Sequence, residues 1–136
     1  FLYWTAGKLF KKQFMQLMGA TKEVIETLTP QQIQVMEQII DYMNPAGLRK
    51  AGANFDHYAP LPNERIAGIH TPTLVVHAKD DTLQPYQNAV FSSSAIPGAT
   101  LMSFDKGGHF VLAVESTSIR QEVCKHITNS LSAAAQ

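Results

Sequence analysis

Two short polar segments carry the residues whose types and spacing could do chemistry. Asp80 and Asp81 directly follow the apolar run TLVVHA, and His109 closes the segment DKGGH. A carboxylate beside an imidazole fixes the tautomer of the ring and stabilises its charged form, as a general base requires. We therefore predict that one of the two aspartates orients His109, and that the other caps its own loop. Gly107 and Gly108 should let the backbone turn tightly before His109.

The elements that flank these segments can bring them together. Residues 73–78 are apolar without alternation, which is typical of a parallel strand that is covered on both faces. A helix is predicted from about residue 85 to residue 95, and a second strand over 100–104. A crossover of this kind makes the strands parallel, so that both carboxyl ends lie at one edge of the sheet. Because neighbouring strands are about 4.8 Å apart, a carboxylate on the loop after the first strand should then reach His109.

The first part of the chain predicts helices, because its apolar residues recur at spacings of three and four. The segment TPQQ at 29–32 is a capping box with proline at the first helical position. Helices are predicted over 2–18 and 22–28, from Pro30 to the Asn44-Pro45 stop, more weakly over 46–58, and over 116–131. The predicted fold class is α/β: a helical region (1–58), a proline-rich connection (59–72) and a β-α-β-α unit with parallel strands (73–136).

The composition excludes several classes of protein. A chain of 136 residues is about one domain, and its 45% hydrophobic and 16% charged residues are typical of a soluble globular protein rather than a disordered one. The 11 basic and 11 acidic residues cancel, so nucleic-acid binding has no support. No apolar run approaches the roughly 20 residues that span a bilayer, so no membrane association is expected. Cys124 is the single cysteine, which excludes an intrachain disulfide and favours a cytoplasmic location, and we expect it to be buried and inert.

The second half of the chain resembles the C-terminal part of an α/β-hydrolase. That family carries its catalytic acid in a pattern like small-x-x-Asp-x-x-x-Pro, and AKDDTLQP matches it with Ala78, Asp81 and Pro85. GGHF supplies the histidine at His109, and ERIAGIHTPTLVV resembles the usual entry into the strand that bears the acid. The resemblance implies that Asp81 and His109 are the catalytic acid and base, with Asp80, Gly107 and Gly108 in support. It also implies that residues 1–58 form a cap, that the substrate is a small or apolar ester-like molecule, and that no cofactor or metal is needed.

The nucleophile of that family is missing from this sequence. The sequence contains no G-x-S-x-G pattern, nor a version with Asp or Cys at its centre, and the chain begins with Phe1 rather than methionine. Ser92, Ser93 and Ser94 fall in the middle of a predicted helix. We therefore expect the C-terminal half of a longer hydrolase, inactive by itself, whose nucleophile and oxyanion loop lie upstream.

Two alternatives stay open. The chain could be a non-catalytic α/β module that self-associates, because two strands alone are rarely stable and both would be open edges. A homodimer, or association with the missing N-terminal half, is expected on the same ground. A zinc site built from His77, Asp81 and His109 has suitable ligand types, although their spacing is not one of the usual zinc motifs.

The roles of the remaining candidates are less specific. His77, inside the predicted strand, is interpreted as a core or lining residue. The methionines and phenylalanines of the helical region either form a core or line an apolar substrate pocket, because methionine adapts to irregular shapes. They are Phe10, Phe14, Met15, Met18, Met36 and Met43, while His57, His70 and His126 are predicted at the surface.

Overall fold

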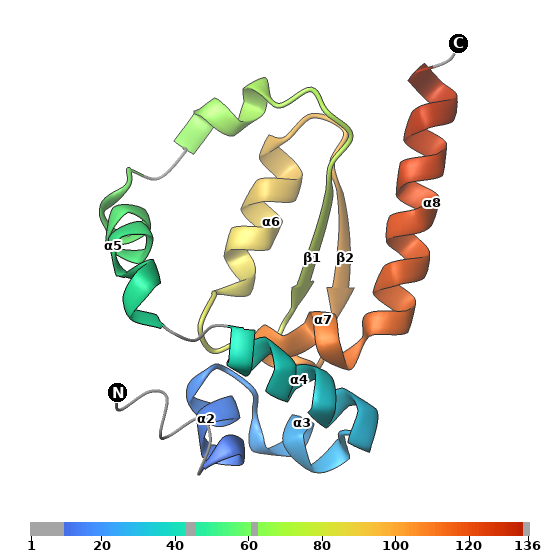
Figure 1. The fold of residues 1–136 in the computed structure, drawn as a ribbon. Helices are drawn as coiled ribbons and strands as arrows, with labels where there is room; N and C mark the ends of the chain where they lie inside the picture. The colour runs from blue at the N-terminus through green and yellow to red at the C-terminus, as the bar shows by residue number, and fades with distance from the viewer. Residues whose placement is uncertain (1–9, 43–45, 61–62, 135–136) are drawn as a thin grey trace.

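A two-stranded parallel sheet lies at the centre of the C-terminal half of the chain. The computed structural model describes residues 10–42, 46–60 and 63–134. In these residues, β1 (Leu74–Ala78) pairs with β2 (Thr100–Phe104), in a register that sets Leu74 opposite Thr100 and Ala78 opposite Phe104. Both strands point toward the helical end of the molecule (Figure 1). The predicted parallel pair is therefore confirmed, with β1 one residue shorter than expected.

Helices α6 (Tyr86–Ala95) and α8 (Ser116–Ala134) lie on opposite sides of this sheet (Figure 1). Their cover is partial: in β1 only Ala78 is buried, and the other four residues are half-buried. The prediction of a strand covered on both faces was therefore wrong for most of its length. A sheet of two strands is too narrow for two helices to enclose it.

Helix α8 is also less buried than its sequence predicts. Only its first turns pack closely, with Ile119 buried, while Val123, Ile127 and Leu131 on the same stripe are exposed. Cys124 is exposed as well, so the prediction of a buried thiol was wrong. The apolar stripe marks a helix correctly, but much of it faces no described neighbour.

Three short helices form the helical end, beyond the carboxyl ends of the strands (Figure 1). They are α2 (Lys11–Leu17), α3 (Lys22–Thr27) and α4 (Pro30–Tyr42). Side chains cap the start of two of them, and only the capping box at Thr29 was predicted from the sequence. The Thr21 hydroxyl accepts a hydrogen bond from the Val24 N–H (3.3 Å), and Thr29 exchanges hydrogen bonds with Gln32 in a capping box. The first part of the helix predicted over 2–18, and the helix stop predicted at Asn44-Pro45, lie outside the described residues.

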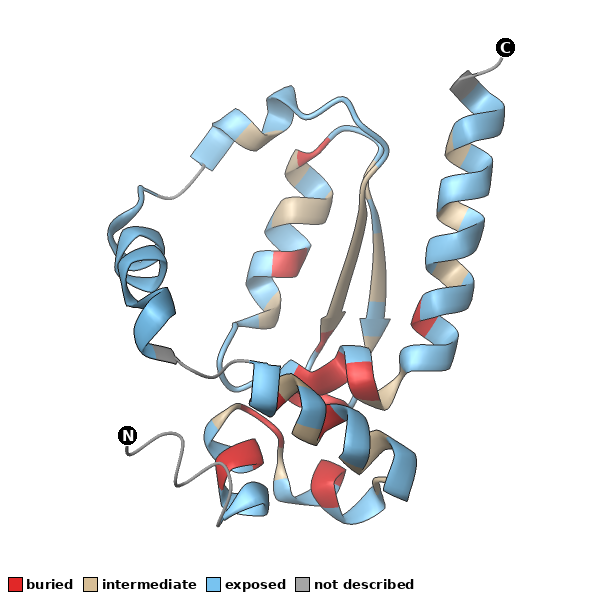
Figure 2. Ribbon diagram, in the orientation of Figure 1, coloured by how far each residue is buried: buried red, intermediate tan, exposed pale blue. Residues whose placement is uncertain are grey.

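The largest hydrophobic core joins this helical end to the segment that follows His109. Phe110, directly before α7 (Val111–Val114), and Ala113 within α7 pack among the buried side chains of α2 to α4. A smaller core under the sheet contains Ala78, Val111 and Ile119. Figure 2 shows the buried residues concentrated at this junction. The helical contribution to the larger core comes from Phe14, Met15, Ala20, Ile25, Met36 and Ile40.

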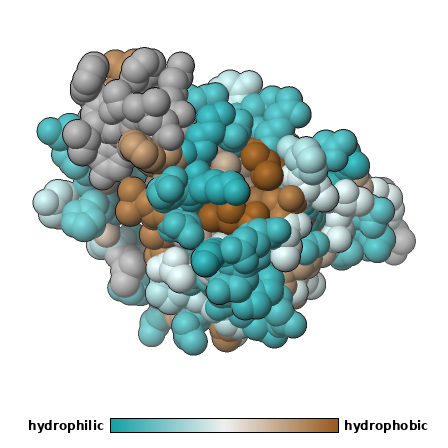
Figure 3. Space-filling view, turned by 90° about the horizontal axis from the view of Figure 1, so that it is seen from below, coloured by the Kyte–Doolittle hydropathy of each residue, from teal (hydrophilic) through white to brown (hydrophobic). Residues whose placement is uncertain are grey.

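The segment between the helical end and the sheet is more exposed. It contains η1 (Ala46–Arg49), α5 (Lys50–Tyr58) and η2 (Asn63–Gly68), and it passes around α6 (Figure 1). No described residue of α5 is buried, and Phe55 and Tyr58 are 74% and 81% exposed. The helical end also exposes apolar side chains among hydrophilic ones when it is seen from below (Figure 3). Phe10, Leu17 and Val35 are exposed residues of that end.

Replacement of Met36 tests the importance of the junction core. Met36 is fully buried, so Met36→Ala should lower the free energy of unfolding by about 2–5 kcal/mol, through lost contacts and an unfilled cavity. Leu48→Ala is the matched control, because Leu48 is 84% exposed and should change stability by less than about 0.5 kcal/mol. Urea unfolding of the two variants measures both values. Equal effects at the two positions would contradict the placement of Met36 in a packed core.

Candidate active site

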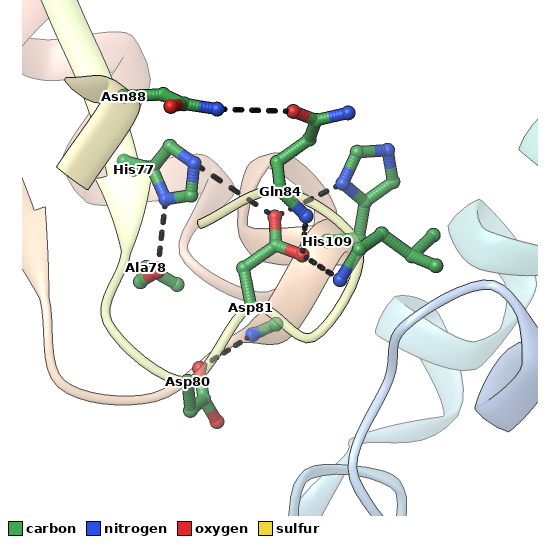
Figure 4. A network of polar contacts seen from close by, with 9 residues as sticks. His77, Ala78, Asp80, Asp81, Gln84, Asn88 and His109 are labelled. Atoms are coloured by element: carbon green, nitrogen blue, oxygen red, sulfur yellow. Dashed lines mark hydrogen bonds and ion pairs between the residues drawn. The ribbon is translucent and has the colours of Figure 1, made fainter. Parts of the chain in front are cut away.

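Asp81 and His109 meet at the carboxyl ends of the two strands. The Nδ1 atom of His109 lies 3.0 Å from Oδ2 of Asp81, within hydrogen-bond distance (Figure 4). The Asp81 side chain is only 5% exposed, whereas the His109 side chain is 41% exposed. The predicted pair is thus brought together, with the carboxylate shielded and the imidazole open to solvent.

The second oxygen of Asp81 is held by its own loop. Oδ1 accepts hydrogen bonds from the N–H groups of Leu83 (2.8 Å) and Gln84 (3.0 Å). Burial raises the pKa of Asp81, but the hydrogen bonds from Gln84, His109 and Leu83 together outweigh burial and hold its pKa below the ordinary value. Asp81 is therefore ionised at neutral pH, and its carboxylate is fixed in orientation by both oxygens.

Asp80 has a different task from the one predicted. Its Oδ1 accepts a hydrogen bond from the N–H of Gly108 (2.8 Å), which ties the loop after β1 to the loop after β2. The turn after β1 is capped by Asp81 instead, so the division of labour expected for the two aspartates was wrong in this respect. The other oxygen of Asp80, Oδ2, is buried and has no hydrogen-bond partner among the described residues.

The glycines before His109 adopt conformations that few other residues could. Gly107 has φ 135° and Gly108 has φ 55°. They lead into a short 3-10 turn, η3 (Gly108–Phe110), which continues directly into α7. The N–H of His109 donates a hydrogen bond to the carbonyl oxygen of Gly19 (3.2 Å), in the turn between α2 and α3. Sequence reasoning did not find Gly19, because no local signal shows that this turn contacts His109.

A second histidine lies beside Asp81. The Nε2 atom of His77 is 4.0 Å from Oδ2 of Asp81, which is beyond hydrogen-bond distance. Its Nδ1 atom is 2.9 Å from the carbonyl oxygen of Ala78, and its ring meets the Tyr86 ring edge to face. The His77 side chain is 15% exposed, so this histidine lies beside the acid, partly shielded from solvent, without a hydrogen bond to it.

The other candidates do not join the site. The hydroxyls of Ser92, Ser93 and Ser94 donate to carbonyl oxygens of their own helix, and so face no base. No group of three or more His, Cys, Asp or Glu side chains in the described part of the chain could hold a metal ion, so the zinc alternative has no geometric support. Of the remaining histidines, His57 and His70 are exposed and His126 is half-buried.

Comparison with known proteins identifies the fold family. The model of a protein family described as "TAP-like protein", a family of α/β-hydrolases, matches residues 41–134, which is more than half of the chain. The chain belongs to this α/β-hydrolase family. The match includes both strands and the loops that carry Asp81 and His109. The two-stranded parallel sheet with its helices is consistent with the C-terminal part of an α/β-hydrolase.

Curated relatives of this α/β-hydrolase match shorter segments. "Putative carbamate hydrolase RutD" from Pseudomonas syringae pv. syringae (strain B728a) is 43% identical over 44 residues, which cover 32% of this chain and 17% of that protein. The protein of the same name from Rhizobium rhizogenes (strain K84 / ATCC BAA-868) is 35% identical over 65 residues, which cover 48% of this chain and 25% of that protein. The matched segments thus span a quarter or less of these two relatives. No solved structure gives a significant match. Within the described residues, no helix has the length and apolarity to cross a membrane.

The lowered pKa of Asp81 predicts an acid-sensitive contribution to stability. Because the folded state holds this pKa below its unfolded value, the ionised carboxylate stabilises the fold above the ordinary pKa of an aspartate. That stabilisation is lost as the pH falls through the lowered pKa. Urea unfolding at a series of pH values from about 7 to about 3 should therefore show a smaller loss of stability in Asp81→Asn than in the parent protein.

Asp105→Asn is the matched control for that experiment. Asp105 follows the other strand, β2, and pairs with Lys79 (2.7 Å), whose hydrogen bond and charge lower the pKa of Asp105 as well. Its side chain is 84% exposed, however, so solvent screens this ion pair and leaves it little effect on stability. This variant should follow the parent pH dependence closely. An Asp81→Asn curve parallel to the parent curve would contradict the hydrogen-bonded, shielded carboxylate.

Proposed function

We propose that this chain supplies the acid and the base of a hydrolase that cleaves a small-molecule ester or carbamate. The observation that carries the proposal is the 3.0 Å hydrogen bond between His109 and Asp81. It lies at the carboxyl ends of parallel strands, where open α/β folds bind their ligands. Membership of an α/β-hydrolase family supports the same conclusion.

In this proposal each nitrogen of His109 has its own role, and the hydrogen bond to Asp81 supports that division. An ionised carboxylate only accepts hydrogen bonds, so Nδ1 of His109 carries the proton that Asp81 Oδ2 receives. The lone pair of the neutral ring is then on Nε2, which has no hydrogen-bond partner among the described residues. In the reaction, Nε2 takes the proton of the attacking nucleophile and later gives it to the leaving group. Asp81 stabilises the imidazolium between these two steps.

In this proposal, a segment other than those that the structure describes supplies the nucleophile. Within the described part of the chain, the serine hydroxyls of α6 are bound to helix carbonyls, and Cys124 is on the outer part of α8. The partly exposed imidazole can accept a group from another segment of the full-length protein. The coding region upstream of Phe1 should encode a strand followed by G-x-S-x-G, or by the same pattern with Asp at its centre.

The substrate class follows from the chemistry of the pair and from the relatives. An acid-base pair that activates a nucleophile serves attack on a carbonyl carbon, which esters and carbamates share. The names of the curated relatives favour the carbamate. The helical region at 1–58 acts as a cap in this proposal, because α2 to α4 lie at the carboxyl ends of the strands, beside the pair.

Substitution of the pair tests the proposal in the full-length protein. His109→Gln removes the base and should lower kcat by about 10²–10⁴-fold on p-nitrophenyl acetate and on an alkyl carbamate. Asp81→Asn keeps the shape of the side chain but no longer stabilises the imidazolium, so it should also lower kcat by at least about 10²-fold. The ratio of the two substrate activities tells whether ester or carbamate is preferred.

Two exposed residues provide matched controls. His70→Gln and Asp105→Asn make the same chemical changes away from the pair, and each should keep kcat within about twofold of the parent value. Retention of parent activity in His109→Gln would reject the proposed function.

The self-associating module remains as the competing proposal. Among the described residues, each of the two strands has one edge without a pairing strand, which is the feature that favours it. A module of this kind should keep its oligomeric state, measured by light scattering, in both Asp81→Ala and His109→Ala. If the full-length protein has no hydrolase activity and self-associates regardless of these changes, the non-catalytic, self-associating module is the correct description.

A further inference from the structure

We propose that Gly19, in the turn between α2 and α3, is a positioning residue for His109. The helical end would then set where the imidazole stands, in addition to covering the site. The inference rests on the proposed function of His109 as the general base. Its basis is the set of close contacts between the Gly19 turn and the two loops that carry the acid and the base.

The Gly19 turn touches the loop of the base directly. The N–H of His109 donates to the Gly19 carbonyl oxygen at 3.2 Å, the backbone hydrogen bond that links α2 and α3 to the site. A Cβ atom placed on Gly19 would lie 2.8 Å from the Cβ of His109, closer than real Cβ atoms approach one another. In Figure 4 the pale blue ribbon of the helical end passes beside the loop that carries His109.

The same turn touches the loop of the acid. The hypothetical Cβ of Gly19 would also lie 2.9 Å from Cγ of Leu83, whose N–H is bound by Oδ1 of Asp81. Gly19 is therefore in contact with the loop that carries Asp81 and with the loop that carries His109. A side chain there would push His109, Leu83 or both, and so change the distance between the imidazole and the carboxylate.

Two glycines make this close approach possible. Gly19 (φ +86°) and Gly108 (φ +55°) meet backbone to backbone, and a Cβ on Gly108 would clash with the Gly19 carbonyl oxygen. The residues on either side are anchored. Phe110 is buried in the same core as Phe14 and Met15, so neither the turn nor the histidine loop can move aside freely.

The role of Gly19 as a helix end does not account for these contacts. Its N–H bonds to the Gln16 carbonyl oxygen, and its positive φ is common where helices stop. That role needs the backbone conformation alone. Gly98 has a similar φ of +73°, yet a Cβ there would meet no atom within 4 Å. The two glycines thus share the conformational requirement and differ in contact with the site.

Alanine substitution of Gly19, with Gly98 as the matched control, tests the inference. Gly19→Ala and Gly98→Ala are compared in the full-length protein, by kcat and KM on p-nitrophenyl acetate and by the ¹H and ¹⁵N resonances of the His109 imidazole. Gly19→Ala should lower kcat by about 10–100-fold with KM within about twofold, and should shift the His109 Nδ1 resonances. Gly98→Ala should leave kcat within about twofold and the resonances in place.

Gly19→Asn keeps the test decisive if the alanine variant fails to fold. Asparagine enters the positive-φ region more readily than alanine, yet it places a Cβ at the same point, so it should reproduce the loss of kcat. In the parent protein, slow hydrogen exchange of the His109 amide is expected from its bond to Gly19. Parent-like kcat and resonances in a folded Gly19 variant, or a fast-exchanging His109 amide, would overturn the inference.

The imidazole resonances also test this inference separately from the proposed function. If His109→Gln keeps full activity, the proposed function fails. The imidazole resonances of the Gly19 variants then decide by themselves whether the turn positions His109. A shift in those resonances supports the positioning role, and unchanged resonances reject it.

Discussion

The hydrogen bonds that pair β1 with β2 bring Ala78 opposite Phe104, and the rest of the site depends on that register. Because the strands are parallel, the loops that follow them leave the sheet side by side. The Lys79 N–H extends the pairing by one bond, to the Phe104 carbonyl oxygen at 2.8 Å, and Lys79 and Asp105 close the two strand ends with an ion pair. From this point each loop needs only a few residues to bring its side chain to the other.

The two aspartates then fix the histidine loop from one side. Asp81 binds the imidazole and its own turn, while Asp80 binds the backbone N–H of Gly108. Adjacent carboxylates in one loop thus hold the side chain and the backbone of the neighbouring loop separately. The side chain of Asp81 is shielded, so its interaction with His109 is stronger than the same contact would be in open solvent.

The helical end holds the histidine loop from the other side. Phe110 and Ala113 enter the core of α2 to α4, and Gln32 donates a hydrogen bond to the Val114 carbonyl oxygen at 2.6 Å. The segment from Gly107 to Val114 is consequently the structural centre of the described molecule, since both cores and both polar loops meet there. Helix α5 and the later turns of α8 contribute little to this centre, and their large apolar residues remain exposed.

The sequence alone determined the two strands, the helices with clear apolar spacing and the identity of the polar residues, but not the short helices η2 and α7. Apolar spacing, the TPQQ capping box and the flanking glycines and prolines are local signals, so they could be read without a fold. The meeting of a carboxylate after β1 with His109 could also be predicted, because the geometry of a parallel crossover is general. The choice of Asp81 came from the resemblance of AKDDTLQP to the hydrolase pattern. Only the tertiary structure decided which aspartate caps the turn, how close His77 comes to Asp81, and that Cys124 and most of β1 are not enclosed. It also decided that Gly19 touches His109. These features depend on contacts between residues far apart in the chain, and local propensity carries no information about which distant neighbour covers a given face.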